Sequence, residues 1–147
     1  MPAAPELSVA EAVVKYFFFL SLDEQISFAA SLKVLGQLKA GNRLDKDHRG
    51  HWVQAVHKWK PKLKKLRGRP WSDSPTVPGF ILPTDLEIAS WVSFMAATEA
   101  EEVEAVLLSR ILGFTDSEIS QGLNVTEGTV RYRVGRGLRH LGGYIES

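Results

Sequence analysis

The chain of 147 residues is 44% hydrophobic and 24% charged, and its formal net charge is +1. This composition predicts a soluble globular protein with enough apolar material for one compact domain or two small ones. The absence of cysteine excludes disulfides and thiolate metal sites, and it is consistent with the reducing cytoplasm that we expect as the location.

Charge is divided unevenly between the two halves of the chain. Residues 1–70 contain 13 Lys and Arg and 6 Asp and Glu, a net charge of +7, whereas residues 71–147 contain 5 and 11, a net charge of −6. The two halves should therefore attract each other, although electrostatics alone permits both docked and separate halves.

The N-terminal half is expected to be helical. Apolar residues recur at helical spacing along Val9–Leu20 and Asp23–Lys39, and a third helix is expected over roughly Gly50–Leu66. Pro61 should kink this third helix or end it at Lys60, because proline has no amide N–H to donate.

No membrane association is predicted. The apolar run Ala12–Leu22 is interrupted by Lys15 and is far shorter than the roughly 20 residues of a membrane-spanning helix. The N-terminus also lacks the basic region of a signal peptide.

A Pro-rich linker is predicted in the middle of the chain, where Pro70, Pro75, Pro78 and Pro83 fall close together. These prolines cannot lie inside a helix, because each removes an N–H donor and disfavours helix in the residue before it. We therefore expect a helical domain over residues 1–69, a linker over 70–84 and a second domain over 85–147.

Helical spacing returns after the linker, over Asp85–Ala97 and Glu101–Leu112, and the remaining sequence predicts two more short helices. No strand signal of comparable length appears. The expected fold class is all-α, with two small helical domains of which the second contains a helix-turn-helix.

The clearest local signals lie in the last third of the chain. Thr115 and Glu118 stand three residues apart at the start of an apolar period, which is typical of a capping box. We expect a helix to begin at Asp116 and to end near Leu123, because Asn124 tolerates the left-handed conformation that reverses the chain.

Thr126 should cap a second helix that runs from Glu127 to about His140. One face of this helix is apolar and carries Val130, Val134, Leu138 and Leu141. The other face is basic and carries Arg131, Arg133, Arg136 and Arg139. Cations in this arrangement suit phosphates and guanine edges in a DNA major groove, as in a helix-turn-helix.

This last third resembles region 4 of the bacterial extracytoplasmic-function sigma factors, through the sequence EAVLLSRILGFTDSEISQGLNVTEGTVRYRVGRGLRHL. In that family the second helix of the pair reads the −35 element of the promoter. The resemblance implies DNA contacts by Thr115, Thr126, Thr129, Arg131, Tyr132, Arg133, Arg136 and Arg139. Of these, Thr115 and Thr126 would lie near the DNA backbone.

The sequence departs from the family pattern at several positions. Ser120 replaces the usual alanine between the two helices and Asn124 replaces the usual glycine, and both changes are sterically mild. Gly135 and Gly137 lie inside the second helix, where each costs about 1 kcal/mol relative to alanine. We therefore expect this helix to be short, or to be fully ordered only on DNA.

The N-terminal half resembles region 2 of the same family, through NRLDKDHRGHWVQAVHKWKPKLKKLRGR. Before it, DEQISFAASLKVLGQL is similar to the family's helix that packs against the polymerase clamp. The resemblance implies contacts with the −10 element, or with single-stranded DNA, by Trp52, His57, Lys58 and Trp59. Aromatic rings can stack there on unpaired bases. An equally weighted alternative is a core stripe at helical spacing, formed by Trp52, Val53, Val56 and Trp59.

Histidines and acids do not indicate a metal or catalytic site. We expect His48, His51 and His57 to be solvated or DNA-facing, and we predict no metal. A cluster of acids at a helix start is favoured there by the helix dipole, and it should face the basic half or polymerase. These acids are Glu99, Glu101, Glu102 and Glu104. No phosphate-binding loop or nucleophile motif is present, so we expect neither a cofactor nor an enzyme.

Three functions compete. The favoured one is a small, divergent alternative sigma factor that binds core RNA polymerase and promoter DNA, with an anti-sigma factor as a further candidate partner. The second is a helix-turn-helix regulator that does not act as a sigma factor and needs only the last third to touch DNA. The third is a sigma-like decoy that occupies polymerase or an anti-sigma factor and ignores promoters.

Overall fold

The computed structural model describes residues 7–66 and 88–145, and these residues form helices and connecting turns without any strand. The expected all-α fold class is confirmed. The predicted linker over residues 70–84 lies outside the described residues. In the N-terminal half the elements are α1 (Val9–Ser21), α2 (Glu24–Ala40), the 3-10 turn η1 (Lys46–His48), α3 (Arg49–Trp59), the 3-10 turn η2 (Lys60–Lys62) and α4 (Leu63–Leu66).

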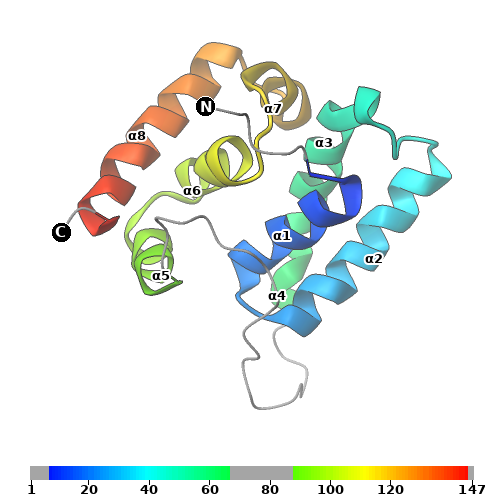
Figure 1. The fold of residues 1–147 in the computed structure, drawn as a ribbon, viewed down its shortest axis with the longest axis horizontal. Helices are drawn as coiled ribbons and strands as arrows, with labels where there is room; N and C mark the ends of the chain where they lie inside the picture. The colour runs from blue at the N-terminus through cyan, green and yellow to red at the C-terminus, as the bar shows by residue number, and fades with distance from the viewer. Residues whose placement is uncertain (1–6, 67–87, 146–147) are drawn as a thin grey trace.

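The C-terminal half contains a helix-turn-helix preceded by two further helices (Figure 1). Its elements are α5 (Ile88–Ala97), α6 (Ala100–Val106), the π-helical turn η3 (Leu107–Ile111), α7 (Asp116–Leu123) and α8 (Glu127–Ile145). Helix α8 packs on α5, α6 and α7.

The break after α3 follows from Pro61, as predicted. Helix α3 ends at Trp59, and the chain tightens into the 3-10 turn Lys60–Lys62 before the short helix α4. Because Pro61 has no N–H, it cannot continue the hydrogen-bond ladder of an α-helix.

One hydrophobic core runs through both halves of the chain. Phe19 of α1 packs edge-on against Trp91 of α5, with ring centroids 5.4 Å apart, and the Trp91 indole N–H donates a hydrogen bond of 2.7 Å to the Phe19 carbonyl. Trp52 of α3 packs in the same way against Phe114, which precedes α7. The two halves are therefore docked, not separate.

Helices α3 and α7 cross closely where the halves meet (Figure 1). A Cβ atom on Gly122 of α7 would collide with the Val53 side chain and would lie 2.8 Å from the backbone nitrogen of Gln54. Because only a residue without a side chain fits at this crossing, Gly122 permits the contact between the halves.

Opposite charges meet across the same junction, in agreement with the attraction expected from the charge balance. The Arg49 guanidinium at the start of α3 lies 3.0 Å from the Glu118 carboxylate of α7. The side chain of Arg49 also donates a hydrogen bond of 3.2 Å to the Gly113 carbonyl.

Candidate nucleic-acid interface

Helix α7 has the bounds that its capping signals predict. The Glu118 amide donates to the Thr115 hydroxyl at 3.1 Å, and the Thr115 amide donates to the Glu118 carboxylate at 2.9 Å. This reciprocal pair is a capping box, which fixes the first turn of the helix. The Thr115 hydroxyl, although exposed, is thus engaged in capping.

The turn between the two helices depends on Ser120 and Asn124. Asn124 adopts the left-handed conformation, with φ 58° and ψ 48°, as expected for the residue that reverses the chain. The Ser120 hydroxyl donates a hydrogen bond of 2.5 Å to the Val125 carbonyl. Ser120 is therefore more than a mild replacement for alanine, because it ties the end of the turn to α7.

Helix α8 begins at a threonine cap, as expected: the Thr129 amide donates to the Thr126 hydroxyl at 3.0 Å. The two threonine hydroxyls lie 2.9 Å apart. Both predicted contact residues therefore stand at the N-terminal end of α8, the end that a recognition helix inserts into the major groove.

The expectation that the glycines would shorten α8 is wrong. The helix runs without interruption from Glu127 to Ile145. At Gly137 it lies directly on α6, where an added Cβ would come 2.5 Å from Val106 Cγ2 and 3.1 Å from the Glu102 carbonyl oxygen. Tertiary packing thus overrides the low helix propensity of glycine at this position.

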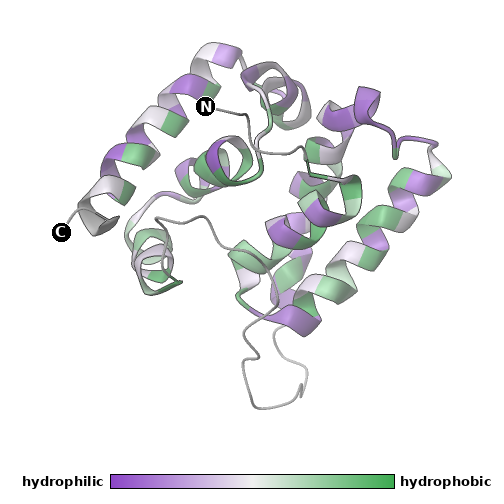
Figure 2. Ribbon diagram, viewed as in Figure 1, coloured by the Kyte–Doolittle hydropathy of each residue, from purple (hydrophilic) through white to green (hydrophobic). Residues whose placement is uncertain are grey.

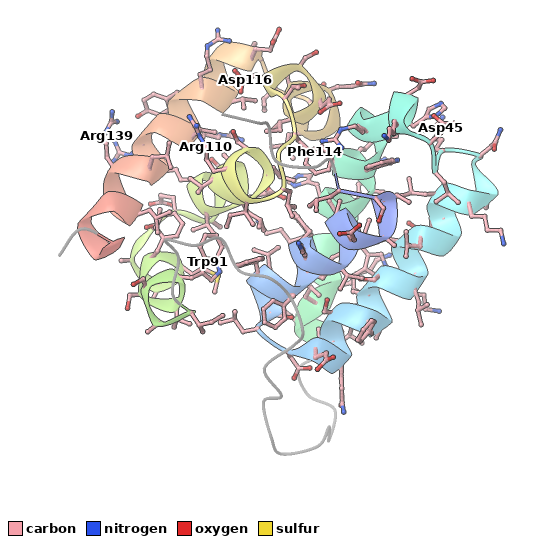
Figure 3. All side chains as sticks on the ribbon, viewed as in Figure 1. Asp45, Trp91, Arg110, Phe114, Asp116 and Arg139 are labelled. Carbon is pink, nitrogen blue, oxygen red and sulfur yellow. The ribbon has the colours of Figure 1, made fainter. Side chains whose placement is uncertain are left out.

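The apolar face of α8 lies inward and its basic face outward (Figure 2). Val130, Val134 and Leu141 are buried, and Leu138 packs partly buried against the core. Figure 3 shows Arg139 pointing away from the body of the molecule. The other exposed members of the predicted contact set on this helix are Arg131, Tyr132 and Arg136.

The arginines of α8 differ in their acidic partners, which the sequence did not indicate. Arg136 Nε lies 2.8 Å from the buried Glu102 carboxylate of α6, and Arg133 lies 3.4 Å from Glu101. Both pairs link α8 to α6.

Arg131 is held less firmly. Its guanidinium lies 3.8 Å from the Asp116 carboxylate, and its side chain is 63% exposed. Because an exposed ion pair at this distance contributes little, Arg131 can leave Asp116 for a DNA group at small cost. Arg131, Tyr132 and Arg139 are therefore exposed side chains of the predicted contact set that no ion pair within the described residues ties to an acid of α6.

The region 2 analogy assigned DNA contacts to two tryptophans that the structure places in the core. Trp52 is 1% exposed and Trp59 is 8% exposed. The Trp52 indole donates to the Arg43 carbonyl at 2.8 Å, and the Trp59 ring packs edge-on against Phe17. Neither ring can stack on a base in this conformation, so the core-stripe alternative describes them.

The region 2 analogy also assigned DNA contacts to His57 and Lys58, and these two side chains are more accessible than the tryptophans. Lys58 is exposed, whereas His57 is partly exposed and lies 2.9 Å from the Glu104 carboxylate.

Another histidine of the N-terminal half, His48, lies 2.8 Å from Asp45. Within residues 7–66 and 88–145 there is no group of three His, Asp or Glu side chains placed to hold a metal ion.

The acids of the predicted cluster have different partners in the structure. Glu104 faces the basic half, as expected for this cluster, whereas Glu101 and Glu102 face the arginines of α8. The cluster of acids was visible in the sequence, but the packing of α8 on α6 was not.

Comparisons with known proteins agree with this architecture. Residues 99–141 match the family model for sigma-70, region 4. A search of curated protein sequences finds no match. Among solved structures, the chain is similar to the sigma factor RpoE from Bartonella quintana, solved in complex with the anti-sigma factor NepR. The identity is 17%, the match covers 94% of this chain and 92% of that chain, and the TM-score is 0.69.

The class defined by this fold and site is that of helix-turn-helix proteins with sigma-factor architecture. Residues 99–141 form a sigma-70 region 4 domain, which confirms the resemblance read from the last third of the sequence. The likeness to RpoE extends the sigma-factor fold over both halves. None of the described helices is long and apolar enough to cross a membrane.

Proposed function

We propose that this protein is a small alternative sigma factor that binds core RNA polymerase and directs it to promoter DNA. The observation that carries the proposal is the region 4 domain, with its outward basic helix α8, inside a chain that has the sigma-factor fold over 94% of its length. An anti-sigma factor is a further proposed partner, by analogy with the RpoE structure.

In this proposal the N-terminal part of α8 reads the −35 element. Thr129, Arg131 and Tyr132 lie in its first two turns, where side chains of a recognition helix reach base edges. Arg139 lies further along the helix and is placed to hold a phosphate, which contributes affinity without sequence information.

Replacing Arg131 with alanine should weaken binding to promoter DNA by about 1–3 kcal/mol, or about 5- to 150-fold in Kd, because a base contact is lost. Arg133→Ala is the matched control, since it removes the same charge from the same helix but from a side chain that is 22% exposed and paired with Glu101. Fluorescence anisotropy with promoter and scrambled duplexes measures both variants. Equal losses would overturn the division of roles, and no loss in either would overturn the recognition-helix assignment.

Helix α2 offers the surface that we propose for polymerase. Its buried side faces the core, but Phe28 and Leu32 on the outer side are 50% and 72% exposed. Leu35, one turn further along, completes an apolar stripe. Exposed apolar residues grouped on one helix face indicate a protein contact, and this helix resembles the one that packs against the polymerase clamp.

Leu32→Glu should therefore abolish most copurification with core polymerase, because it places a charge in the middle of this stripe, while thermal unfolding should stay within a few degrees of the original protein. Gln37→Glu adds the same charge at an exposed position of α2 away from the stripe and should leave binding intact. If Leu32→Glu binds polymerase as well as Gln37→Glu does, the clamp contact does not lie on this face.

One observation favours a second candidate, the sigma-like decoy. Trp52 and Trp59 are buried, and Arg133 and Arg136 are tied to acids, so fewer side chains face DNA than the family pattern implies. Such a protein would bind polymerase or an anti-sigma factor without reading promoters. Transcription from a bound polymerase distinguishes the two candidates.

A further inference from the structure

A buried carboxylate of α6 faces the basic helix α8. Glu102 is 4% exposed, and its Oε1 lies 2.8 Å from the Nε of Arg136. Close packing sets this position, because at Gly137, the residue after Arg136, an added Cβ would come 3.1 Å from the Glu102 carbonyl oxygen. Arg136 therefore meets Glu102 where the two helices are in direct contact.

The pairing uses only part of the guanidinium. Glu102 Oε2 is buried and has no hydrogen-bond partner among the described residues, so the two groups do not form the bidentate pair that arginine and carboxylate commonly make. The Nε–H of Arg136 is a single donor, and the terminal nitrogens carry the remaining N–H groups. Because the Arg136 side chain is 48% exposed, these groups can reach a second acceptor outside the protein.

Packing alone does not explain a carboxylate at this position. A buried charge is unfavourable unless it is paired and hydrogen-bonded, and Glu102 has one oxygen that is paired and one that is not. Apolar side chains often replace a buried ion pair without loss of stability, so an apolar contact between α6 and α8 would serve the fold as well. A hold on the orientation of Arg136 gives the charge a reason.

Arg136 stands on the outer side of α8, beyond its first two turns from Glu127. Tyr132, one turn earlier, is 61% exposed, and Arg139, almost one turn later, points away from the body of the molecule (Figure 3). Tyr132 and then Glu102 raise the pKa of Arg136 through charge and hydrogen bonding. Residues near the start of a recognition helix reach base edges, whereas residues further along can contact the DNA backbone.

We propose that Glu102 is a positioning residue, which holds Arg136 through Nε so that the terminal nitrogens of the guanidinium face a phosphate of the DNA backbone. This inference rests on the DNA binding in the proposed function. A mobile arginine loses rotamer freedom when an interface immobilises it, whereas Arg136 has lost this freedom before DNA binds. The planar guanidinium suits the task, because it can donate to Glu102 and to a phosphate at once.

The sign of one effect separates this role from simple competition. If Glu102 withheld Arg136 from DNA, removing its charge would strengthen DNA binding. If Glu102 positions Arg136, Glu102→Gln should weaken binding by about 2- to 12-fold, because the side chain must then be ordered on DNA. Glu101→Gln is the matched control, since it makes the same change on α6 at a side chain that is 73% exposed, and it should not weaken binding.

Arg136→Lys tests the guanidinium itself. Lysine keeps the charge beside Glu102, but its single ammonium cannot meet the carboxylate through one nitrogen and a phosphate through others. The loss should therefore be similar to that of Glu102→Gln. Arg139→Lys is the control on the same helix and should lose less than about twofold, because a lone phosphate contact accepts an ammonium. The double variant Glu102→Gln/Arg136→Lys should lose no more than Arg136→Lys alone, since both changes act through one contact.

Two measurements on the full chain give the answer. Fluorescence anisotropy with promoter and scrambled duplexes should show equal losses on both, because a phosphate contact carries no sequence information. Nitrogen-15 relaxation of the arginine Nε–H signals without DNA should show Arg136 rigid in the original protein and mobile in Glu102→Gln, with Arg139 mobile in both. Thermal unfolding checks the fold of each variant, and Arg136→Lys carries the test if Glu102→Gln does not fold.

Equal or tighter DNA binding by Glu102→Gln, or a mobile Arg136 Nε–H in the original protein, would overturn the positioning role. A loss confined to the promoter duplex would overturn the phosphate assignment and place Arg136 on a base edge. Failure of the sigma-factor proposal is a separate result, since it would appear in the original sequence as absence of promoter-specific transcription with polymerase, whatever Glu102→Gln does to duplex binding.

Discussion

Replacing Trp52 with alanine should lower the free energy of unfolding by about 3–5 kcal/mol, the usual cost of removing a large buried aromatic side chain. Trp52 is 1% exposed, packs against Phe114 across the junction, and donates its indole N–H to the Arg43 carbonyl. Its loss would leave a cavity where the halves meet and an unpaired carbonyl. Urea denaturation followed by circular dichroism measures the effect.

Lys58→Ala provides the comparison, because Lys58 lies on the same helix but is exposed, and its removal should change stability by no more than about 0.5 kcal/mol. A Trp52→Ala protein that is as stable as Lys58→Ala, yet fails to open promoter DNA, would contradict the core assignment and would return Trp52 to base stacking.

The second large effect is expected from a pair of glycines in α8. Gly137→Ala should destabilise the protein by about 1–3 kcal/mol, because the new methyl group would meet Val106 at 2.5 Å and the Glu102 carbonyl oxygen at 3.1 Å. Gly135→Ala should instead stabilise it by up to about 1 kcal/mol, because an added Cβ there meets nothing within 4 Å and alanine favours helix.

The midpoint temperature of thermal unfolding should fall in Gly137→Ala and rise in Gly135→Ala, although both variants add the same methyl group. Promoter binding should weaken in Gly137→Ala, because the added methyl group pushes α8 away from the helix that supports it. It should stay the same in Gly135→Ala, because the position of α8 is unchanged. Shifts of the same sign and size in both variants would contradict the close packing of α8 on α6.

Local signals predicted those parts of the fold that depend on a few neighbouring residues. The capping pair Thr115 and Glu118 and the left-handed residue Asn124 fixed both ends of α7, and Pro61 ended the regular α-helix of α3. These features follow from backbone hydrogen bonding within one or two turns, so they can be read without knowledge of the tertiary structure.

The rest depends on contacts between helices. The spacing of Trp52 and Trp59 is the same for a core stripe and for a base-stacking face, and only the packing of α1 and Phe114 against them decides between the two. Similarly, Gly137 looked like a helix weakness until its contact with α6 was known.

The net charges of the two halves predicted some of the ion pairs but not others. The opposite net charges of the two halves predicted attraction, and Glu104 does face the basic half. The balance could not assign Glu101 and Glu102 to the arginines of α8, because those pairs lie within the C-terminal half and depend on how α6 and α8 pack. The division of the α8 arginines into those paired with acids of α6 and those that are not therefore emerged only from the structure.

The proposal that this protein acts as a sigma factor is tested by run-off transcription with purified core RNA polymerase on genomic fragments. We predict stoichiometric binding to polymerase and transcripts that start at specific promoters and are lost in Leu32→Glu and reduced in Arg131→Ala. Polymerase binding without specific transcripts would contradict the claim in favour of the decoy, and absence of polymerase binding would contradict it in favour of a DNA-binding regulator.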